Sequence, residues 1–134
     1  MNCRPCRLLI SLTCSVLVGC SYGTALENSG RAVKLMHTLN SAEAEYRRQH
    51  GHYGDLSALG PSGANLIAQD LASGKASGYE FHLKASVSGY VATAWPLVQN
   101  KTGFRSLYCN ESGVIRGNWT ERATATSEPV SQVR

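Results

Sequence analysis

The spacing of the apolar residues changes once along the chain, and this change limits the possible folds more than any other feature. Between residues 31 and 50, apolar side chains recur at helical spacing: Ala32, Leu35, Met36, Leu39, Ala42 and Tyr46. From Tyr79 the period becomes two, with apolar Tyr79, Phe81 and Leu83 alternating with polar residues. A helix followed by strands predicts an α+β domain whose helices cover one face of a sheet.

The boundaries of the first helix follow from its capping residues. Asn28 and Ser29 are good N-cap residues, and Gly51 is a natural C-cap. We therefore expect a helix that begins near Asn28 or Ser29 and ends at His50. Glu43 falls within the apolar stripe. Because an unpaired buried carboxylate is costly, Glu43 either meets backbone amides or an arginine, or lies at the edge of the stripe. We interpret it as structural rather than catalytic.

The remaining elements are shorter. Residues 50–61 are predicted to form a loop that Leu56 and Leu59 hold to the core, followed by a second helix over residues 64–72 that Ser62 caps and Gly74 ends. Four strands in an antiparallel meander are then expected, at residues 79–84, 90–98, 106–110 and 114–118. Residues from about 120 onward are polar and featureless, which predicts a disordered tail.

The first twenty residues have the layout of an export signal. Arg4 and Arg7 precede a mostly apolar run, residues 8–17, which is shorter than the about 20 apolar residues that a bilayer span needs. The run ends in Leu17-Val18-Gly19-Cys20, which resembles the lipobox of bacterial lipoproteins. The resemblance implies cleavage before Cys20, a diacylglycerol on its sulfur and a further acyl chain such as palmitate. The alternative is an ordinary signal peptide that contains a cysteine by chance.

These features divide the chain into four parts: a signal peptide (1–19), a lipidated polar tether (20–30), an α+β domain (31–119) and the tail (120–134). Two of the positive charges behind the net charge of +4 lie in the signal, and the rest form no basic stripe, so we expect no nucleic-acid partner. Cys3, Cys6 and Cys14 also lie in the signal. Once Cys20 is lipidated, Cys109 remains as a free thiol and no intramolecular disulfide can form.

Residues that carry chemistry are sparse. His50 and His52 flank Gly51, but Asp55 is the only nearby carboxylate, which favours solvated histidines over a metal site. Cys109 has no adjacent base and is interpreted as a small buried hydrophobic residue. We therefore predict a protein with no catalytic residue, no cofactor and no metal. Trp95 is expected in the core. Trp119 is expected on an exposed contact surface, and Tyr108 is a further candidate for such a surface.

The domain resembles a known family. The segment Leu39-Asn40-Ser41-Ala42-Glu43-Ala44-Glu45-Tyr46 is similar to the soluble half of the long helix in type IV pilin-like and type II secretion pseudopilin-like proteins, and residues 53–60, 76–81 and 106–116 resemble their loop, first strand and closing hairpin. The resemblance implies a pilin-like headpiece. A pilin has an apolar, filament-forming helix half before this segment, and here the lipobox and the polar residues 20–30 replace it.

These observations predict a membrane-tethered, non-enzymatic lipoprotein, an accessory or interaction component of a cell-envelope assembly. Its expected partners are the membrane, through the lipid, and a protein of a pilus or secretion system. The alternative is a free-standing ligand-binding or structural lipoprotein with the same fold. We expect a monomer that faces the periplasm. In Gram-negative lipoproteins, an aspartate directly after the lipidated cysteine favours retention at the inner membrane. Ser21 occupies this position here, which favours an outer-membrane location.

Overall fold

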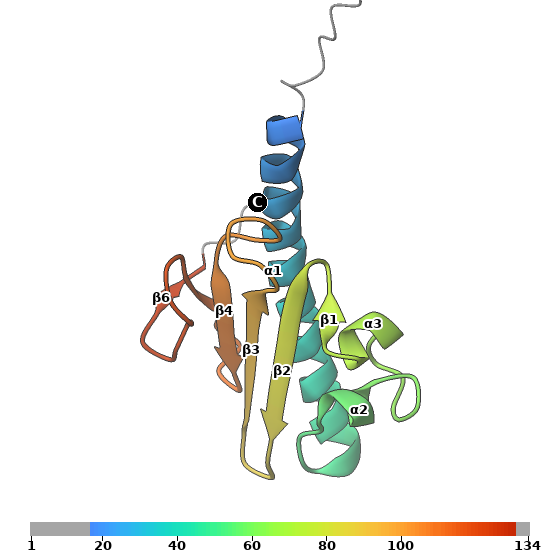
Figure 1. The fold of residues 1–134 in the computed structure, drawn as a ribbon. Coiled ribbons are helices and arrows are strands. Elements are labelled where there is room, and N and C mark those ends of the chain that lie inside the picture. The colour runs from blue at the N-terminus through green and yellow to red at the C-terminus, as the bar shows by residue number, and fades with distance from the viewer. Residues whose placement is uncertain (1–16, 131–134) are drawn as a thin grey trace, which may run out of the picture.

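A single long helix, α1 (Leu17–His50), runs along one face of an antiparallel sheet in the computed structural model (Figure 1). The structure describes residues 17–130, and residues 17–22 by their backbone alone. Residues 1–16 of the predicted signal peptide (1–19) and the last four residues of the chain lie outside the described part. The α+β class is confirmed, as is the end of the helix at His50, where Gly51 has a φ of 78°.

The predicted start of the helix at Asn28 or Ser29 is wrong, because the expected tether, residues 20–30, is helical. Contacts with the loop over residues 97–105 support this part of α1. Asn28 Nδ2 donates a hydrogen bond to the carbonyl of Thr102 at 3.0 Å, and Ser29 Oγ accepts one from the backbone amide of Phe104 at 3.0 Å. Ala25 is fully buried. The helix therefore continues where the sequence offers no long apolar stripe.

Two single-turn helices, α2 (Leu56–Leu59) and α3 (Gln69–Ala72), connect α1 to the sheet. The second predicted helix is thus confirmed over its last turn alone, and part of the expected loop is helical. Asp55 caps α2, since its Oδ1 accepts a hydrogen bond from the Ala58 amide at 2.7 Å. Leu59, expected to hold the loop to the core, is buried, as are Ile67 and Leu71.

The sheet is a meander in which each strand pairs antiparallel with the next. Its strands are β1 (Lys75–Ala76), β2 (Tyr79–Ala85), β3 (Tyr90–Pro96), β4 (Ser106–Asn110), β5 (Arg116–Asn118) and β6 (Glu128–Pro129). The expected count of four is wrong because β1 and β6, two residues each, extend the two edges. Strand β3 ends at Pro96, two residues earlier than expected, as a proline without an N–H favours.

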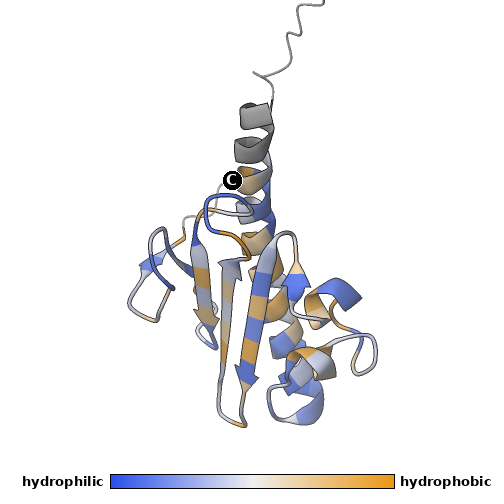
Figure 2. Cartoon of the chain, viewed as in Figure 1, coloured by the Kyte–Doolittle hydropathy of each residue, from blue (hydrophilic) through white to orange (hydrophobic). Residues whose placement is uncertain are grey.

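The core lies between α1 and the inner face of the sheet. Apolar and polar residues alternate along the strands, as the hydropathy colouring shows (Figure 2). The buried residues of α1 and of the strands include Ala32, Met36, Leu39, Ala42, Tyr79, Phe81, Tyr90, Ala92, Ala94, Leu107 and Cys109. The predicted inward face of β4, with Leu107 and Cys109, is confirmed.

The expectation of a disordered tail is wrong up to residue 130. Ser106 Oγ donates a hydrogen bond to the Glu121 carbonyl and accepts one from the Ala123 amide at 2.7 Å. Farther along, β6 pairs with β5, and the Val130 amide donates to the Ile115 carbonyl at 2.8 Å. Backbone hydrogen bonds and one buried serine hydroxyl hold this segment, together with buried Ala123 and with Val130, which packs against the core.

Candidate binding groove

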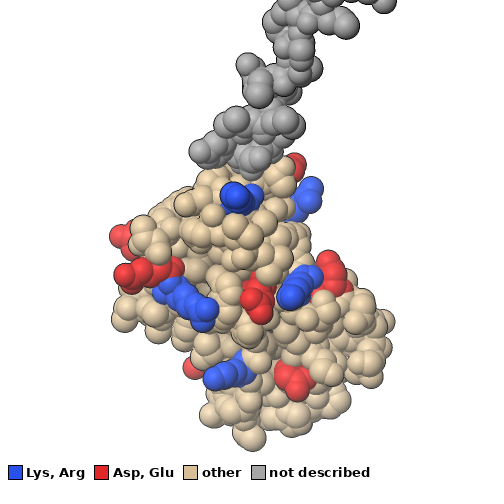
Figure 3. Space-filling view, in the orientation of Figure 1, with Lys and Arg blue, Asp and Glu red and all other residues tan. Residues whose placement is uncertain are grey.

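The two faces of the sheet differ, because α1 covers one and leaves the other open. A groove of about 480 Å³ lies on the open face. Its lining residues come from β2, β3, the start of β4 and the segment 119–127: His82, Lys84, Val91, Thr93, Trp95, Ser106, Leu107, Arg122 and Ala123. Figure 3 shows this face of the molecule, where cationic and acidic side chains are interspersed. The size is that of a site for a small molecule or a short chain segment.

Trp95 is the centre of the groove. The His82 ring stacks on it with centroids 4.4 Å apart and planes at 19°, and the Arg122 Cζ lies 3.9 Å from the Trp95 ring centroid. The indole face attracts the guanidinium, an interaction worth about 0.5–1 kcal/mol at an exposed site. The stack therefore holds the Arg122 guanidinium against the open face of the sheet.

Glu80 is engaged inside this cluster. Its Oε2 accepts a hydrogen bond from Trp95 Nε1 at 3.2 Å, and its Oε1 lies 3.3 Å from His82 Nε2. By contrast, Lys84 and Arg122 have no hydrogen-bond or ion-pair partner among the side chains that the structure describes. The groove thus offers two unpaired cations, Lys84 opposite apolar Val91 and Arg122 over Trp95, an arrangement suited to an extended ligand that carries a carboxylate beside an apolar group.

The prediction that Trp95 lies in the core is wrong. The alternation of β3 buries Tyr90, Ala92 and Ala94, and this parity directs Val91, Thr93 and Trp95 to the open face. The alternation of side chains along β3 is the sequence feature that could have identified the residues of the groove. The contribution of Arg122 has no such signal, because the polar residues from about 120 onward predict a disordered tail.

The predicted lipidation residue, Cys20, lies in the first turns of α1, and its side chain is outside the described residues. Cys109 is a buried free thiol, as expected. Its Sγ donates to Asn40 Oδ1 at 3.2 Å, and Tyr90 donates to the same oxygen. Burial raises the pKa of the Cys109 thiol, which disfavours the reactive thiolate.

Glu43 is fully buried, and of the three alternatives that the sequence leaves open, contact with a backbone amide is the one observed. Gly54 N donates to Glu43 Oε2 at 3.0 Å, while Oε1 has no hydrogen-bond partner. Burial raises the pKa of Glu43 to about 7, although the Gly54 hydrogen bond opposes this shift. Gly54 can approach because it lacks a side chain, since a Cβ there would lie 3.0 Å from the Tyr46 ring.

The other candidate residues are not brought together into one site. His50 and His52 have ring centroids 6.2 Å apart beside Tyr46, and residues 17–130 contain no cluster of three or more metal-ligating side chains. Trp119 is exposed, as predicted, and the Arg105 Cζ lies 5.1 Å from its ring centroid. Tyr108 is half-buried.

Comparison with models of known protein families, with curated proteins and with solved structures finds nothing that matches this chain. Among the described residues, α1 included, no helix combines the length and the apolar character that crossing a membrane requires.

Proposed function

We propose that the chain is a lipid-anchored, non-enzymatic lipoprotein of the bacterial cell envelope whose head domain binds a partner through the open face of its sheet. The continuity of α1 carries the proposal. The helix continues from Cys20 into the core without a break, so a lipid on Cys20 would be joined to the head domain by a helix rather than by an extended tether. The length of this helix would then set the distance of the groove from the membrane.

The fold supports the pilin-like part of this proposal. A long N-terminal helix packed lengthwise against one face of an antiparallel meander is the arrangement that the resemblance to pilins and pseudopilins implies. The residues that resemble that family, 39–46, lie in the packed half of α1, where Leu39, Ala42 and Glu43 are buried. We therefore propose an accessory role in a pilus or secretion assembly of the envelope, with the protein facing the periplasm.

The groove gives the proposed partner its chemistry. Lys84 and Arg122 are unpaired cations, and Val91, which lies opposite Lys84 on β3, is an exposed apolar residue. An extended segment that carries an acidic residue next to an apolar one would satisfy both features.

Lipidation is tested by expressing the full chain and its Cys20→Ala variant in a Gram-negative host. The wild-type protein should have a mature mass that includes three acyl chains and should sediment with membranes. Cys20→Ala should be unprocessed or released. Cys14→Ala is the matched control, because it removes a cysteine of the same signal and should leave processing unchanged. A processed, membrane-bound Cys20→Ala protein contradicts the proposal.

Partner binding is tested by crosslinking in cells that express pilus and secretion systems. Recovery of a pilus or secretion component with the wild type, and its loss with Arg122→Glu or Lys84→Glu, is the expected result. Lys75→Glu is the control, because Lys75 is an exposed cation on β1, outside the groove. Equal recovery with all three variants would exclude the groove as the binding surface.

The volume of the groove favours one alternative, a free-standing lipoprotein that binds a small organic acid. Calorimetric titration of the purified protein with aromatic and aliphatic carboxylates separates the two functions. Saturable binding that Arg122→Glu abolishes, without any crosslinked partner, would favour the small-molecule function.

A further inference from the structure

Exposed apolar side chains gather at one end of the molecule. In the described part of the chain seven large apolar residues are exposed, and four of them, Leu26, Leu97, Val98 and Trp119, lie at the end where α1 begins. Their exposed fractions are 66%, 47%, 48% and 60%. We name these four residues the anchor-end patch. Figure 1 shows the loop between β3 and β4 beside the upper turns of α1.

Hydrogen bonds fix the members of the anchor-end patch relative to one another. The bonds from Asn28 and Ser29 hold the loop over residues 97–105 against α1. Gln99 Nε2 donates to the Trp119 carbonyl at 3.2 Å and to the Phe104 carbonyl at 2.7 Å, which joins the segment after β5 to the same loop. The patch is therefore a built surface rather than a set of independent side chains.

The position of the patch along α1 places it close to the proposed anchor. Leu26 follows Cys20 by six residues, a rise of about 9 Å at 1.5 Å per residue. Thr102, which contacts Asn28, lies at a level about 12 Å from Cys20 by the same rise. The polar layer of a bilayer is about 5–8 Å thick on each side, so α1 has to tilt toward the loop over residues 97–105 for the patch to reach this layer.

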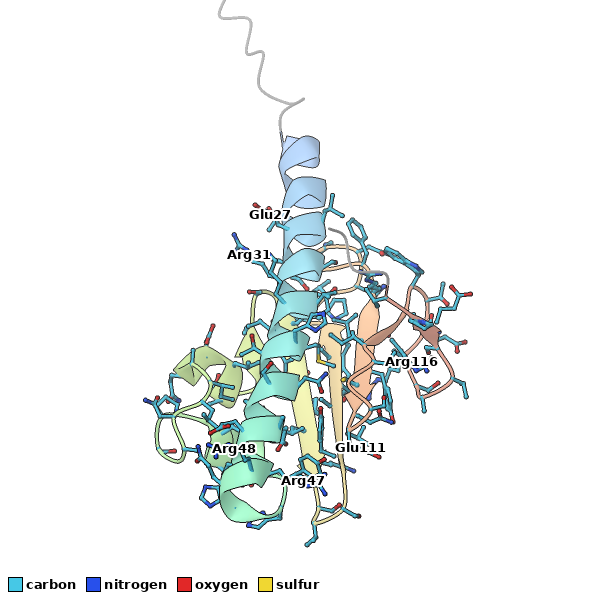
Figure 4. All side chains as sticks on the ribbon, turned by 180° about the vertical axis from the view of Figure 1, so that it is seen from behind. Glu27, Arg31, Arg47, Arg48, Glu111 and Arg116 are labelled. Atoms are coloured by element: carbon cyan, nitrogen blue, oxygen red, sulfur yellow. The ribbon has the colours of Figure 1, made fainter. Side chains whose placement is uncertain are left out.

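The charges around the patch suit a negatively charged lipid surface. Lys101 is exposed in the same loop and has no side-chain partner among the described residues, and the Arg105 guanidinium lies over the Trp119 ring. Of the acidic residues near this end, Glu27 projects to the side of α1 away from β4 (Figure 4), and exposed Glu121 follows Trp119 by two residues. Tryptophan and lysine are residues that favour the membrane–water interface.

From this arrangement we infer that the anchor-end patch lies against the lipid surface, so that the lipid on Cys20 and the patch together hold the domain in one tilted orientation. The inference rests on the proposed lipidation of Cys20. A second copy of the chain, or a protein partner, seated on the patch is the competing outcome. Lipid contact by two signals also makes anchoring more stable than acylation alone.

The test uses Trp119, one of the two tryptophans of the chain, as a depth probe. Trp95→Phe leaves Trp119 as the sole tryptophan. The lipidated protein is reconstituted in vesicles of phosphatidylethanolamine and phosphatidylglycerol whose acyl chains carry bromine, which quenches nearby indoles. Fluorescence should fall about twofold or more relative to unbrominated vesicles, because an interfacial ring lies at the headgroup–acyl boundary. Adding Val98→Glu to this protein should reduce the quenching.

The matched control combines Trp95→Phe, Trp119→Phe and Val87→Trp. Val87 is 74% exposed in the turn between β2 and β3, at the opposite end of the sheet, so its tryptophan should not be quenched. Mass spectrometry of the same samples separates the two proposals. A lipidated protein whose Trp119 is unquenched overturns the patch and leaves the anchor. A protein without lipid on Cys20 overturns both.

Discussion

The two halves of α1 are held in different ways. The half over residues 31–50 buries Ala32, Met36, Leu39 and Ala42 against the sheet. In the half over residues 17–30, Ala25 and Ser29 are the buried residues among the side chains that the structure describes. Apolar packing therefore stabilises the second half, whereas hydrogen bonds to one loop stabilise the first. A helix can thus extend well beyond the stretch that its apolar periodicity predicts.

The largest expected effect is in the packed half. Met36 is fully buried in the core cluster, and Met36→Ala should lower the free energy of unfolding by about 2–5 kcal/mol, since it leaves a cavity between α1 and the sheet. Urea unfolding followed by circular dichroism measures this. Leu26→Ala is the control in the other half, where the side chain is mostly exposed, and should change stability by no more than about 0.5 kcal/mol. Similar losses for both variants would remove the distinction between the halves.

The next effect concerns Glu43, also in the packed half. Its pKa rises from 4.5 to about 7 on folding, so between these values the folded state binds more protons than the unfolded state. Stability should then be greatest below about pH 4.5, as far as this group decides it, and should fall by on the order of 3 kcal/mol as the pH rises through 7. Unfolding curves at pH 5 and pH 8 measure the difference.

Glu43→Gln should remove this pH dependence, because the amide oxygen can still accept the Gly54 hydrogen bond without carrying a charge. Glu43→Leu should be less stable than Glu43→Gln, since it leaves the Gly54 amide unsatisfied. If the wild type and Glu43→Gln have the same pH profile, Glu43 is not the group that titrates.

The sequence predicts an element correctly where its apolar residues recur at helical or strand spacing and are also buried in the fold. The packed half of α1, the alternation in β2 and the inward face of β4 all follow from apolar spacing. Elements that depend on polar contacts do not follow from the sequence pattern. Asn28 and Ser29 hold the first half of α1, and Ser106 holds the segment after β5. Such contacts join residues far apart in the sequence, and no local pattern encodes them. The groove was missed for the same reason, because Arg122 lies on that segment.

Ser29 tests the polar attachment of the first half. Ser29→Ala removes the acceptor of the Phe104 amide and the hydrogen bond with Tyr79 Oη at 3.0 Å, so it should cost about 1–3 kcal/mol. Ser41→Ala is the matched control on the exposed side of the packed half and should be neutral or slightly stabilising. Denaturant unfolding of both proteins gives the comparison. A neutral Ser29→Ala would show that the loop over residues 97–105 does not depend on this contact.

The smallest effect compares one chemical change at two positions of α1. Gly23 and Gly30 are both exposed, and no heavy atom lies within 4 Å of a Cβ built at either. Gly30→Ala should raise the free energy of unfolding by up to about 1 kcal/mol, because Gly30 lies between buried Ser29 and buried Ala32 and orders only when the domain folds. Gly23 precedes Ala25, the first buried residue among the described side chains, so the helix around it can open while the core stays folded. Gly23→Ala should therefore leave the global stability unchanged and slow amide hydrogen exchange of residues 21–27 by up to about fivefold. If Gly23→Ala raises the melting temperature as much as Gly30→Ala does, the first half of α1 unfolds together with the core, and the division of the helix into two halves is wrong.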